Sequence, residues 1–324
     1  MPSTRWISSV STLRLIVLGV TILCASIVIT SCQITESSHA EGWVLMDSLT
    51  SADLNAIDGA SNDLIYAVGA EGTVLTNSDG AWHIVDVPVE TDLYDVWVGS
   101  ANNIFAVGAN GTILHYDGVS WSDTSVSSFV TLRSIWSDDE GHLMLAGDMG
   151  TVMEYTDGAW QLIPSSNSST LAAGWGGQVL VHPGLDLKQT FLTVARGHGL
   201  AHYDGDEWDF LGVASGGYIQ SIWGDCWNDL FAVGTDGLIV HFNGRTLSRQ
   251  TSPTIHDLRA VSGRYRTVAL AVGDNGAAVF YNGSTWSSVS EDDLEINFRG
   301  VWMSKDHTAY VVGESGTVYH WSSR

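Results

Sequence analysis

The chain has 324 residues, 44% of them hydrophobic, and 36 acidic residues outnumber 13 basic ones for a net charge of −23 at pH 7. That length and apolar content suffice for a large packed core. The negative field repels phosphate backbones and therefore argues against a nucleic-acid partner.

Residues 1–31 have the organisation of a secretion signal. Arg5 and Arg14 precede an apolar run at 15–30, which is shorter than the roughly 20 residues of a membrane span. The run ends in "ITSC", which resembles a bacterial lipobox; the resemblance implies lipid on Cys32 and a short tether at 32–41. Gln33 favours the outer membrane of a Gram-negative cell envelope, on either its periplasmic or its surface side. An ordinary signal peptide or an uncleaved anchor is the alternative.

Seven similar copies of about 40 residues follow the tether. Segments such as "GANGTILHYDGVSW" (108–121) and "GTDGLIVHFNGRTL" (234–247) recur along the chain. The second glycine of each copy marks the period, with spacings of 39, 39, 49, 38, 39 and 40: Gly72, Gly111, Gly150, Gly199, Gly237, Gly276 and Gly316. The long spacing places an insertion, about 176–190, between the first and second strands of the fourth copy. A fixed period of this length is typical of a β-propeller.

Each copy reads as four short strands. "NIFAVG" (103–108) and "GTILHY" (111–116) are β-rich runs whose two-residue, glycine-flanked joint predicts a tight hairpin. The seventh copy lacks a fourth strand, whereas Gly42–Leu49 precedes the first copy and reads as an unpaired one. The sequence therefore predicts an all-β fold at 42–324, a seven-bladed β-propeller of four-stranded blades whose last blade is closed by the N-terminal strand.

The repeated pattern resembles the bacterial WD40/YVTN/BNR-like propeller superfamily, especially exported proteins that repeat "VWGxxxxDVFAVGxxGTIxHYDGxxW". It is distantly similar to the photosystem II assembly-factor propellers. The turns "SDGAW" and "YDGVSW" resemble degenerate Asp-boxes. These resemblances imply the fold, and propellers as a class host many unrelated activities.

One repeated position is neither uniform nor apolar, which makes it the candidate binding site. It lies where each inner strand begins, near the expected mouth of the central channel. Its residues are Asn55, Tyr94, Arg133, Ala172, Gln220, Arg259 and Arg299. We expect Arg133, Arg259 and Arg299, with Tyr94, Gln220 and Asn55, to bind an anionic or carboxylate-bearing group, because arginine offers a two-pronged donor. Pairing of each arginine with a nearby acid, such as Asp257 or Asp95, is the alternative.

Two further positions repeat with one residue type. Tryptophan recurs three residues after the mouth position, at Trp97, Trp136, Trp175, Trp223 and Trp302, and is expected to pack between blades. Histidine recurs at His115, His202, His241 and His320, on different blades. Spread round a ring, these histidines do not predict a metal site.

No enzymatic motif stands out. The chain has no HExxH, GxSxG or P-loop pattern and no arginine motif of the sialidase type near its start. The sequence predicts a non-enzymatic cell-envelope lipoprotein without cofactor, whose propeller binds a protein or other ligand. A carbohydrate-binding or sialidase-like, glycan-active propeller is the alternative, and two channel carboxylates about 5–10 Å apart would favour it.

Overall fold

The computed structural model describes residues 42–322 except 127–128, 139–140, 166–167, 179–188, 196–198, 205–206, 213–216, 227 and 292–293. The chain divides into two compact units, Met1–Ser38 and His39–Arg324, and all described residues belong to the second. The predicted signal segment, the predicted lipidation at Cys32 and the predicted tether lie outside the described residues. Within the described ranges, no helix is long and apolar enough to cross a bilayer.

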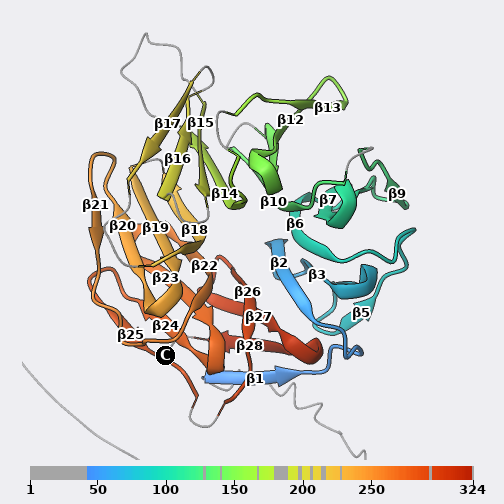
Figure 1. Ribbon diagram of the computed structural model, residues 1–324. Helices are drawn as coiled ribbons and strands as arrows, with labels where there is room; N and C mark the ends of the chain where they lie inside the picture. Colours follow the sequence, from blue (N-terminus) through green and yellow to red (C-terminus); the bar gives the residue numbers. More distant parts are fainter. Residues whose placement is uncertain are drawn as a thin grey trace, which may run out of the picture. The chain divides into compact units, whose positions relative to one another are not determined.

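The described residues form β-strands and single-turn 3-10 helices, and 28 strands build seven antiparallel sheets of four strands each. The sheets are arranged round a centre in chain order (Figure 1). Blades 1 to 3 are β2 (Leu54–Ser61), β3 (Leu64–Gly69), β4 (Val74–Asn77), β5 (Trp82–Ile84); β6 (Leu93–Ser100), β7 (Asn103–Gly108), β8 (Ile113–Tyr116), β9 (Trp121–Asp123); and β10 (Leu132–Ser137), β11 (Leu143–Gly147), β12 (Val152–Thr156), β13 (Ala159–Leu162).

The remaining blades follow the same order from the inner strand outward. Blades 4 to 6 are β14 (Leu171–Gln178), β15 (Gln189–Ala195), β16 (Gly199–Tyr203), β17 (Trp208–Leu211); β18 (Ile219–Cys226), β19 (Asp229–Gly234), β20 (Ile239–Phe242), β21 (Leu247–Arg249); and β22 (Leu258–Arg264), β23 (Val268–Gly273), β24 (Ala278–Tyr281), β25 (Trp286–Ser288). Blade 7 is β26 (Phe298–Met303), β27 (Thr308–Gly313), β28 (Val318–Ser322) and β1 (Gly42–Met46). The predicted all-β propeller of four-stranded blades is confirmed.

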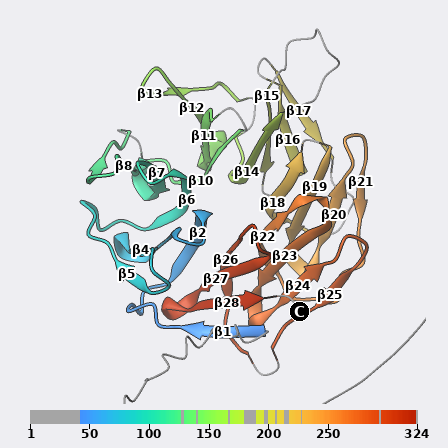
Figure 2. The same cartoon turned by 180° about the vertical axis from the view of Figure 1, so that it is seen from behind.

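The N-terminal strand pairs with the end of the chain. β1 lies antiparallel to β28, with Trp43 opposite Trp321, and the two strands run side by side in both views (Figures 1 and 2). Each inner strand contacts the inner strand of the next blade, and β26 contacts β2. The ring is therefore closed by contacts between its first and last blades, and blade 7 combines both ends of the described chain.

The core lies between the blades. The second strands, such as β7 and β19, are buried along nearly their whole length. Continuous apolar runs suit strands that are covered on both faces. The buried clusters join neighbouring blades: Tyr310 and Val312 of blade 7 pack with Leu54 and Ile65 of blade 1. Burial of this apolar area, at about 25 cal/mol per Å², is the main force that holds adjacent blades together.

The turn between the second and third strands differs from the predicted two-residue hairpin. It is a three-residue 3-10 turn, as in Ala70–Gly72 (η1), whose middle residue is left-handed. The following glycine is also left-handed, with φ +68° at Gly72 and +70° at Gly316. A Cβ at Gly316 would lie 2.0 Å from the carbonyl oxygen of Thr50, in the connection that leads to the inner strand of the next blade. The repeated glycine is thus required by its backbone angle and by the close approach of the neighbouring blade.

The insertion predicted at about 176–190 lies mostly outside the described ranges, which omit 179–188. On either side of that gap, β14 ends at Gln178 and β15 begins at Gln189.

Candidate binding site at the channel mouth

The inner strands surround a cavity of about 600 Å³, and all seven blades contribute to its lining. The six predicted mouth residues all line it: Asn55, Tyr94, Arg133, Gln220, Arg259 and Arg299. The structure therefore brings these residues, which span most of the chain, to one cavity. Ala172 lines it at the same position in blade 4.

A repeated β-bulge positions these side chains. In every blade the register between the first and second strands skips the mouth residue, as between Leu93 and Asp95 around Tyr94 and between Leu132 and Ser134 around Arg133. The same shift occurs in the other five blades. A bulged residue has no partner in the ladder, so its side chain is free to turn away from the sheet. The bulge explains why this position varies while its neighbours follow the core pattern.

Each mouth arginine is held by an acid of its own blade. The Nε and Nη2 atoms of Arg133 donate to the two carboxylate oxygens of Asp148 at 2.6 and 3.0 Å. Arg259 binds Asp274 in the same two-pronged way, with Nη2 at 2.8 Å from Oδ2. Nη2 of Arg299 lies 3.0 Å from Oε1 of Glu314. Charge-assisted pairs of this kind fix the guanidinium group in space.

The three arginine–acid pairs share one spacing in the sequence. Every acid lies 15 residues after its arginine, in the first position of the 3-10 turn. Copies without arginine have no acid there: Asn55, Tyr94 and Gln220 are followed by Ala70, Ala109 and Thr235. The two positions therefore change together within one chain.

The alternative that each arginine pairs with a nearby acid is therefore what the structure shows, but the partners are Asp148, Asp274 and Glu314. The two acids named as examples, Asp257 and Asp95, hold backbone N–H groups instead. Asp257 accepts the backbone N–H of Asp236 from the preceding blade, at 2.9 Å. Asp95 accepts the backbone N–H of Ile135, also at 2.9 Å. Each arginine instead pairs with the acid that the hairpin between the second and third strands presents to it, 15 residues later in the chain.

The paired arginines keep unused donors. A guanidinium group has five N–H donors, and Arg133 and Arg259 each use two sites on their acids. Arg133 also lies over the ring of Tyr94, 5.5 Å from its centroid, in a cation–π contact between blades 2 and 3. Rigid groups with free N–H bonds facing a cavity can bind carbonyl oxygens without losing their internal partner.

Arg299 contributes to ring closure as well. Its guanidinium donates to Oδ1 of Asn55 at 2.9 Å and lies 2.9 Å from a carboxylate oxygen of Asp53. Asn55 in turn donates to the carbonyl of Leu93 in blade 2 at 2.8 Å. Two of the six mouth residues thus connect blades 7, 1 and 2.

The mouth face is strongly acidic. We define it as the 3-10 turns between second and third strands, the five residues before each inner strand, and the mouth residues themselves. Within its described residues it has three arginines and ten acids: Asp53, Glu71, Glu90, Asp92, Asp148, Asp236, Asp257, Asp274, Glu295 and Glu314. With a net charge of −7 and every arginine already paired, this face does not favour the anionic ligand that the arginines suggested.

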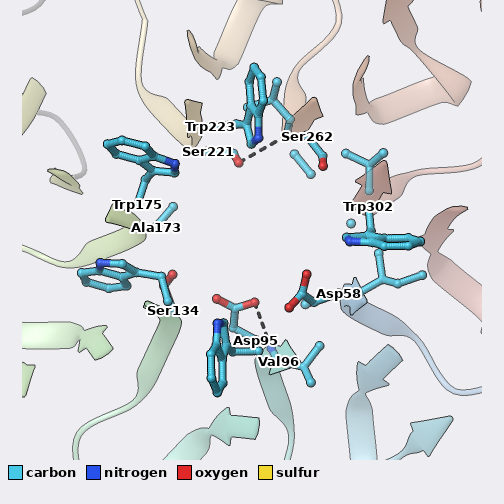
Figure 3. A pocket seen from close by; sticks show the side chains of 18 of the residues that line it. Asp58, Asp95, Val96, Ser134, Ala173, Trp175, Ser221, Trp223, Ser262 and Trp302 are labelled. Carbon is cyan, nitrogen blue, oxygen red and sulfur yellow. Dashed lines mark hydrogen bonds between the residues drawn. The ribbon is translucent and has the colours of Figure 1, made fainter. Parts of the chain in front are cut away.

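Below the mouth, the tryptophan position has two exceptions that the sequence analysis missed. Where five blades have tryptophan, blade 1 has Asp58 and blade 6 has Ser262, and both line the cavity. Figure 3 shows Asp58 and Asp95 from neighbouring blades at one side of the channel. Alignment of the seven copies would have revealed the exceptions, because a charged residue there departs from an otherwise aromatic position.

Polar side chains on five inner strands accept backbone hydrogen bonds from the inner strand of the next blade. Asp58 accepts the backbone N–H of Val98 at 2.7 Å. Four other side chains each accept a backbone N–H from the inner strand of the following blade, at 2.9 to 3.3 Å. These acceptors are Asp95 (from Ile135), Ser134 (from Gly174), Ser221 (from Val261) and Ser262 (from Met303). Inner strands are sheet edges, so their outward N–H groups need such acceptors.

Burial gives both channel carboxyl groups raised pKa values. Loss of solvation raises the pKa of Asp58 to about 7 and that of Asp95 to about 6, although backbone hydrogen bonds act in the opposite direction. The charge of Asp95 adds to the rise at Asp58. Perturbed carboxyl groups in a cavity can mark a catalytic site. Here, however, each already holds a backbone N–H of the adjacent inner strand, which gives it a structural task.

The repeated tryptophans pack against neighbouring blades, as predicted. A Cβ at Gly59 of blade 1 would lie 3.0 Å from the ring of Trp302, and one at Gly263 of blade 6 would lie 2.7 Å from that of Trp223. The indole nitrogens of Trp175, Trp223 and Trp302 point toward the channel (Figure 3). These residues both fill the interfaces between blades and line the channel.

The repeated histidines stay apart, each on the third strand of its own blade, in β8, β16, β20 and β28. His115 stacks on Phe105 with ring centroids 4.2 Å apart, and His241 bonds Asp229 at 2.6 Å. Among the described residues no group of three or more potential ligands could hold a metal ion.

Comparisons with known proteins show the fold alone. No family model matches the chain, and no curated protein matches its sequence. Solved structures do: YCF48 bound to D1 peptide has a TM-score of 0.70 at 17% identity, covering 88% of this chain and 96% of that one. YCF48 from Cyanidioschyzon merolae has a TM-score of 0.65 at 16% identity, covering 87% and 99%. Streptogramin B lyase has a TM-score of 0.72 at 12% identity, covering 86% and 97%. The chain is thus similar to propellers from end to end of its described part.

Proposed function

We propose that the protein is a non-enzymatic, lipid-anchored scaffold of the bacterial cell envelope, whose propeller binds a protein segment across the channel mouth. The observation that carries this proposal is the set of mouth side chains on seven identical bulges, with arginines held rigidly and N–H donors left free. Such preorganised donors suit the carbonyl oxygens of a polypeptide. The similar structure of YCF48 bound to D1 peptide supports a peptide ligand for this architecture.

The lipid anchor rests on the sequence of the leader. The apolar run and "ITSC" support attachment at Cys32, and Gln33 supports the outer membrane. Metabolic labelling with an alkyne fatty acid tests this directly. Wild type should incorporate the label, and Cys32→Ser should not. Equal labelling of Cys226→Ser and wild type is the expected control result, and a labelled Cys32→Ser protein would contradict the anchor.

A crosslinking pull-down from envelopes of the native host tests the scaffold. Arg133→Ala/Asp148→Ala together with Arg259→Ala/Asp274→Ala removes two mouth pairs without leaving an unpaired carboxylate. Arg245→Ala, in an exposed turn after β20, is the matched control. A protein captured by wild type and by the control, but lost with the mouth variant, supports the proposal. Equal capture by all three variants would place the partner elsewhere.

A glycan-active propeller is the second candidate, because Asp58 and Asp95 provide two channel carboxyl groups with raised pKa values. Streptogramin B lyase shows that a similar propeller can be an enzyme. Incubation with a panel of chromogenic glycosides at pH 5 to 8 tests it. We expect no turnover above that of Asp58→Asn/Asp95→Asn. Turnover that this variant abolishes would establish the enzyme.

A further inference from the structure

The mouth face carries exposed apolar side chains as well as acids. Five large hydrophobic residues on it are more than half exposed: Leu49 (57%), Phe129 (97%), Met149 (67%), Tyr218 (61%) and Ile255 (83%). Phe129 and Ile255 precede inner strands, and Met149 sits in a 3-10 turn. Exposed apolar groups at an end of a fold that already bears a lined cavity mark an interaction surface.

Met149 departs from the rule of its position. The middle residue of the 3-10 turn is left-handed, and the other five equivalent turns in the described chain place Glu71, Asn110, Asp236, Asn275 or Ser315 there. Met149 has φ 57° and an exposed side chain. A left-handed backbone favours Asn or Asp over other residues with a side chain. A methionine at this position therefore lowers the free energy of unfolding, and burial of its largely exposed side chain does not compensate for this.

A backbone hydrogen bond joins the segments that contain Phe129 and Met149. The connection that contains Phe129 ends at Thr131, whose carbonyl oxygen accepts the N–H of Asp148, next to Met149, at 2.9 Å. Asp148 also holds Arg133. We call Phe129 and Met149 the apolar patch. It adjoins the rigid arginine of blade 3, so one extended segment can contact the patch and the channel mouth together.

The charge of the face selects the partner. Its ten acids exceed its three arginines by seven charges in the described residues, and each arginine is neutralised locally by an acid. Glu71 and Glu90, on the side of blades 1 and 2, are exposed and belong to this surplus. A positively charged segment gains from this field in both encounter rate and register, whereas an acidic one is repelled.

We propose that the mouth face binds a basic polypeptide segment with large apolar residues, which cover Phe129 and Met149 while its Lys or Arg side chains meet the acidic rim. This inference rests on the proposed scaffold function and names the chemistry of its partner. The unused N–H bonds of Arg133 and Arg259 then donate to backbone carbonyl oxygens of the segment. Because an acid neutralises each of these arginines, they do not repel a basic ligand.

A random 12-residue peptide library displayed on phage, selected against the immobilised full chain in detergent, tests the inference. The consensus peptide is then titrated by fluorescence anisotropy in low and high salt. We expect a consensus rich in Lys or Arg and in apolar residues, with an affinity that falls at least tenfold from 50 to 300 mM salt. Phe129→Ser/Met149→Asn should weaken it at least tenfold. Val119→Ser, at a residue 86% exposed in the β8–β9 turn, should leave it unchanged.

The other outcomes separate the two proposals. An acidic or uncharged consensus, or a basic peptide that the patch variant binds as tightly as wild type does, overturns the basic partner and leaves the scaffold standing. A library that yields no consensus overturns both. Met149→Asn places a residue already used at this position in two other blades, so a loss of binding with this variant is not a loss of folding.

Discussion

Arg299 of the last blade donates a hydrogen bond to Asn55 of the first, at 2.9 Å and across 244 residues of sequence. This contact closes the ring on the mouth face. In the same blade, Trp43 of β1 stacks on Phe298 of β26 with ring centroids 5.7 Å apart, and its indole N–H donates to the carbonyl of Val289, after β25 of blade 6, at 2.7 Å. Mouth geometry and ring closure therefore both depend on blade 7.

Removal of the Trp43 side chain, which anchors β1 to the rest of the ring, should lower the stability of the fold. Trp43→Ala removes the stacking contact and leaves the Val289 carbonyl without its donor, so the free energy of unfolding should fall by about 2 to 4 kcal/mol. Urea denaturation followed by circular dichroism measures it. Leu45→Ala, on the same strand but 63% exposed, should change it by less than about 0.5 kcal/mol. Equal effects of the two variants would show that β1 does not hold the ring.

The arginine–acid pairs should behave as coupled units. Arg133→Ala or Asp148→Ala alone should lower the free energy of unfolding by about 1 kcal/mol, because each leaves a half-buried charge without its partner. The double variant should lose less than the sum, with a coupling of at least about 0.5 kcal/mol. Thermal and urea unfolding of the four proteins gives this cycle. Additive losses would mean that the pair is not formed in solution.

The channel carboxyl groups should make stability depend on pH. Unfolded Asp58 releases its proton near pH 4, whereas the folded protein keeps it until about pH 7. Folding is therefore destabilised as pH rises from 4 to 7, and the cost is constant above that range. Asp58→Asn keeps an oxygen for the Val98 N–H but does not titrate, so its stability relative to wild type should rise across this window.

Urea unfolding at pH 4.5, 6 and 8 checks this prediction. Asp95→Asn should show the same trend over a window that ends nearer pH 6. It should also lower the pKa of Asp58 by removing a neighbouring negative charge. A stability difference that does not vary with pH would show that the channel carboxyls are ionised and solvated throughout.

Met149 should lower the free energy of unfolding, because its backbone is left-handed. Met149→Asn places a residue that tolerates the left-handed backbone, so we expect the free energy of unfolding to rise by about 0.5 to 1 kcal/mol. The reverse exchange, Asn110→Met in blade 2, should lower it by a similar amount. Denaturant titration of both variants tests the pair of expectations. If Met149→Asn is less stable than wild type, methionine has a packing role in its own turn.

Much of the fold follows from the sequence because the propeller repeats one local pattern. Gly72 and its six equivalents all have a left-handed backbone, and Trp43 stands one period before Trp82. These features depend on neighbours within one blade or on a fixed period. Strand order and the pairing of β1 with β28 could therefore be predicted from spacing alone.

The candidate site was only partly predictable. Variation at the mouth position pointed to Arg133, but its partner Asp148 is brought near by the hairpin, not by sequence proximity. Asp58 escaped notice because its role is to bind Val98 of the next blade, 40 residues later. Contacts between blades depend on the register of two sheets, and no pattern within a single copy specifies them.

The proposed function requires that the mouth face binds a protein segment. Its most direct test is photo-crosslinking in the envelope of the native host, with benzoylphenylalanine placed at Tyr94 in the mouth or at Val119 in the β8–β9 turn, at the other end of the strands. We expect an adduct from position 94 and none from position 119, with the linked segment basic and apolar by mass spectrometry. No adduct from position 94, or the same adduct from both positions, would contradict it.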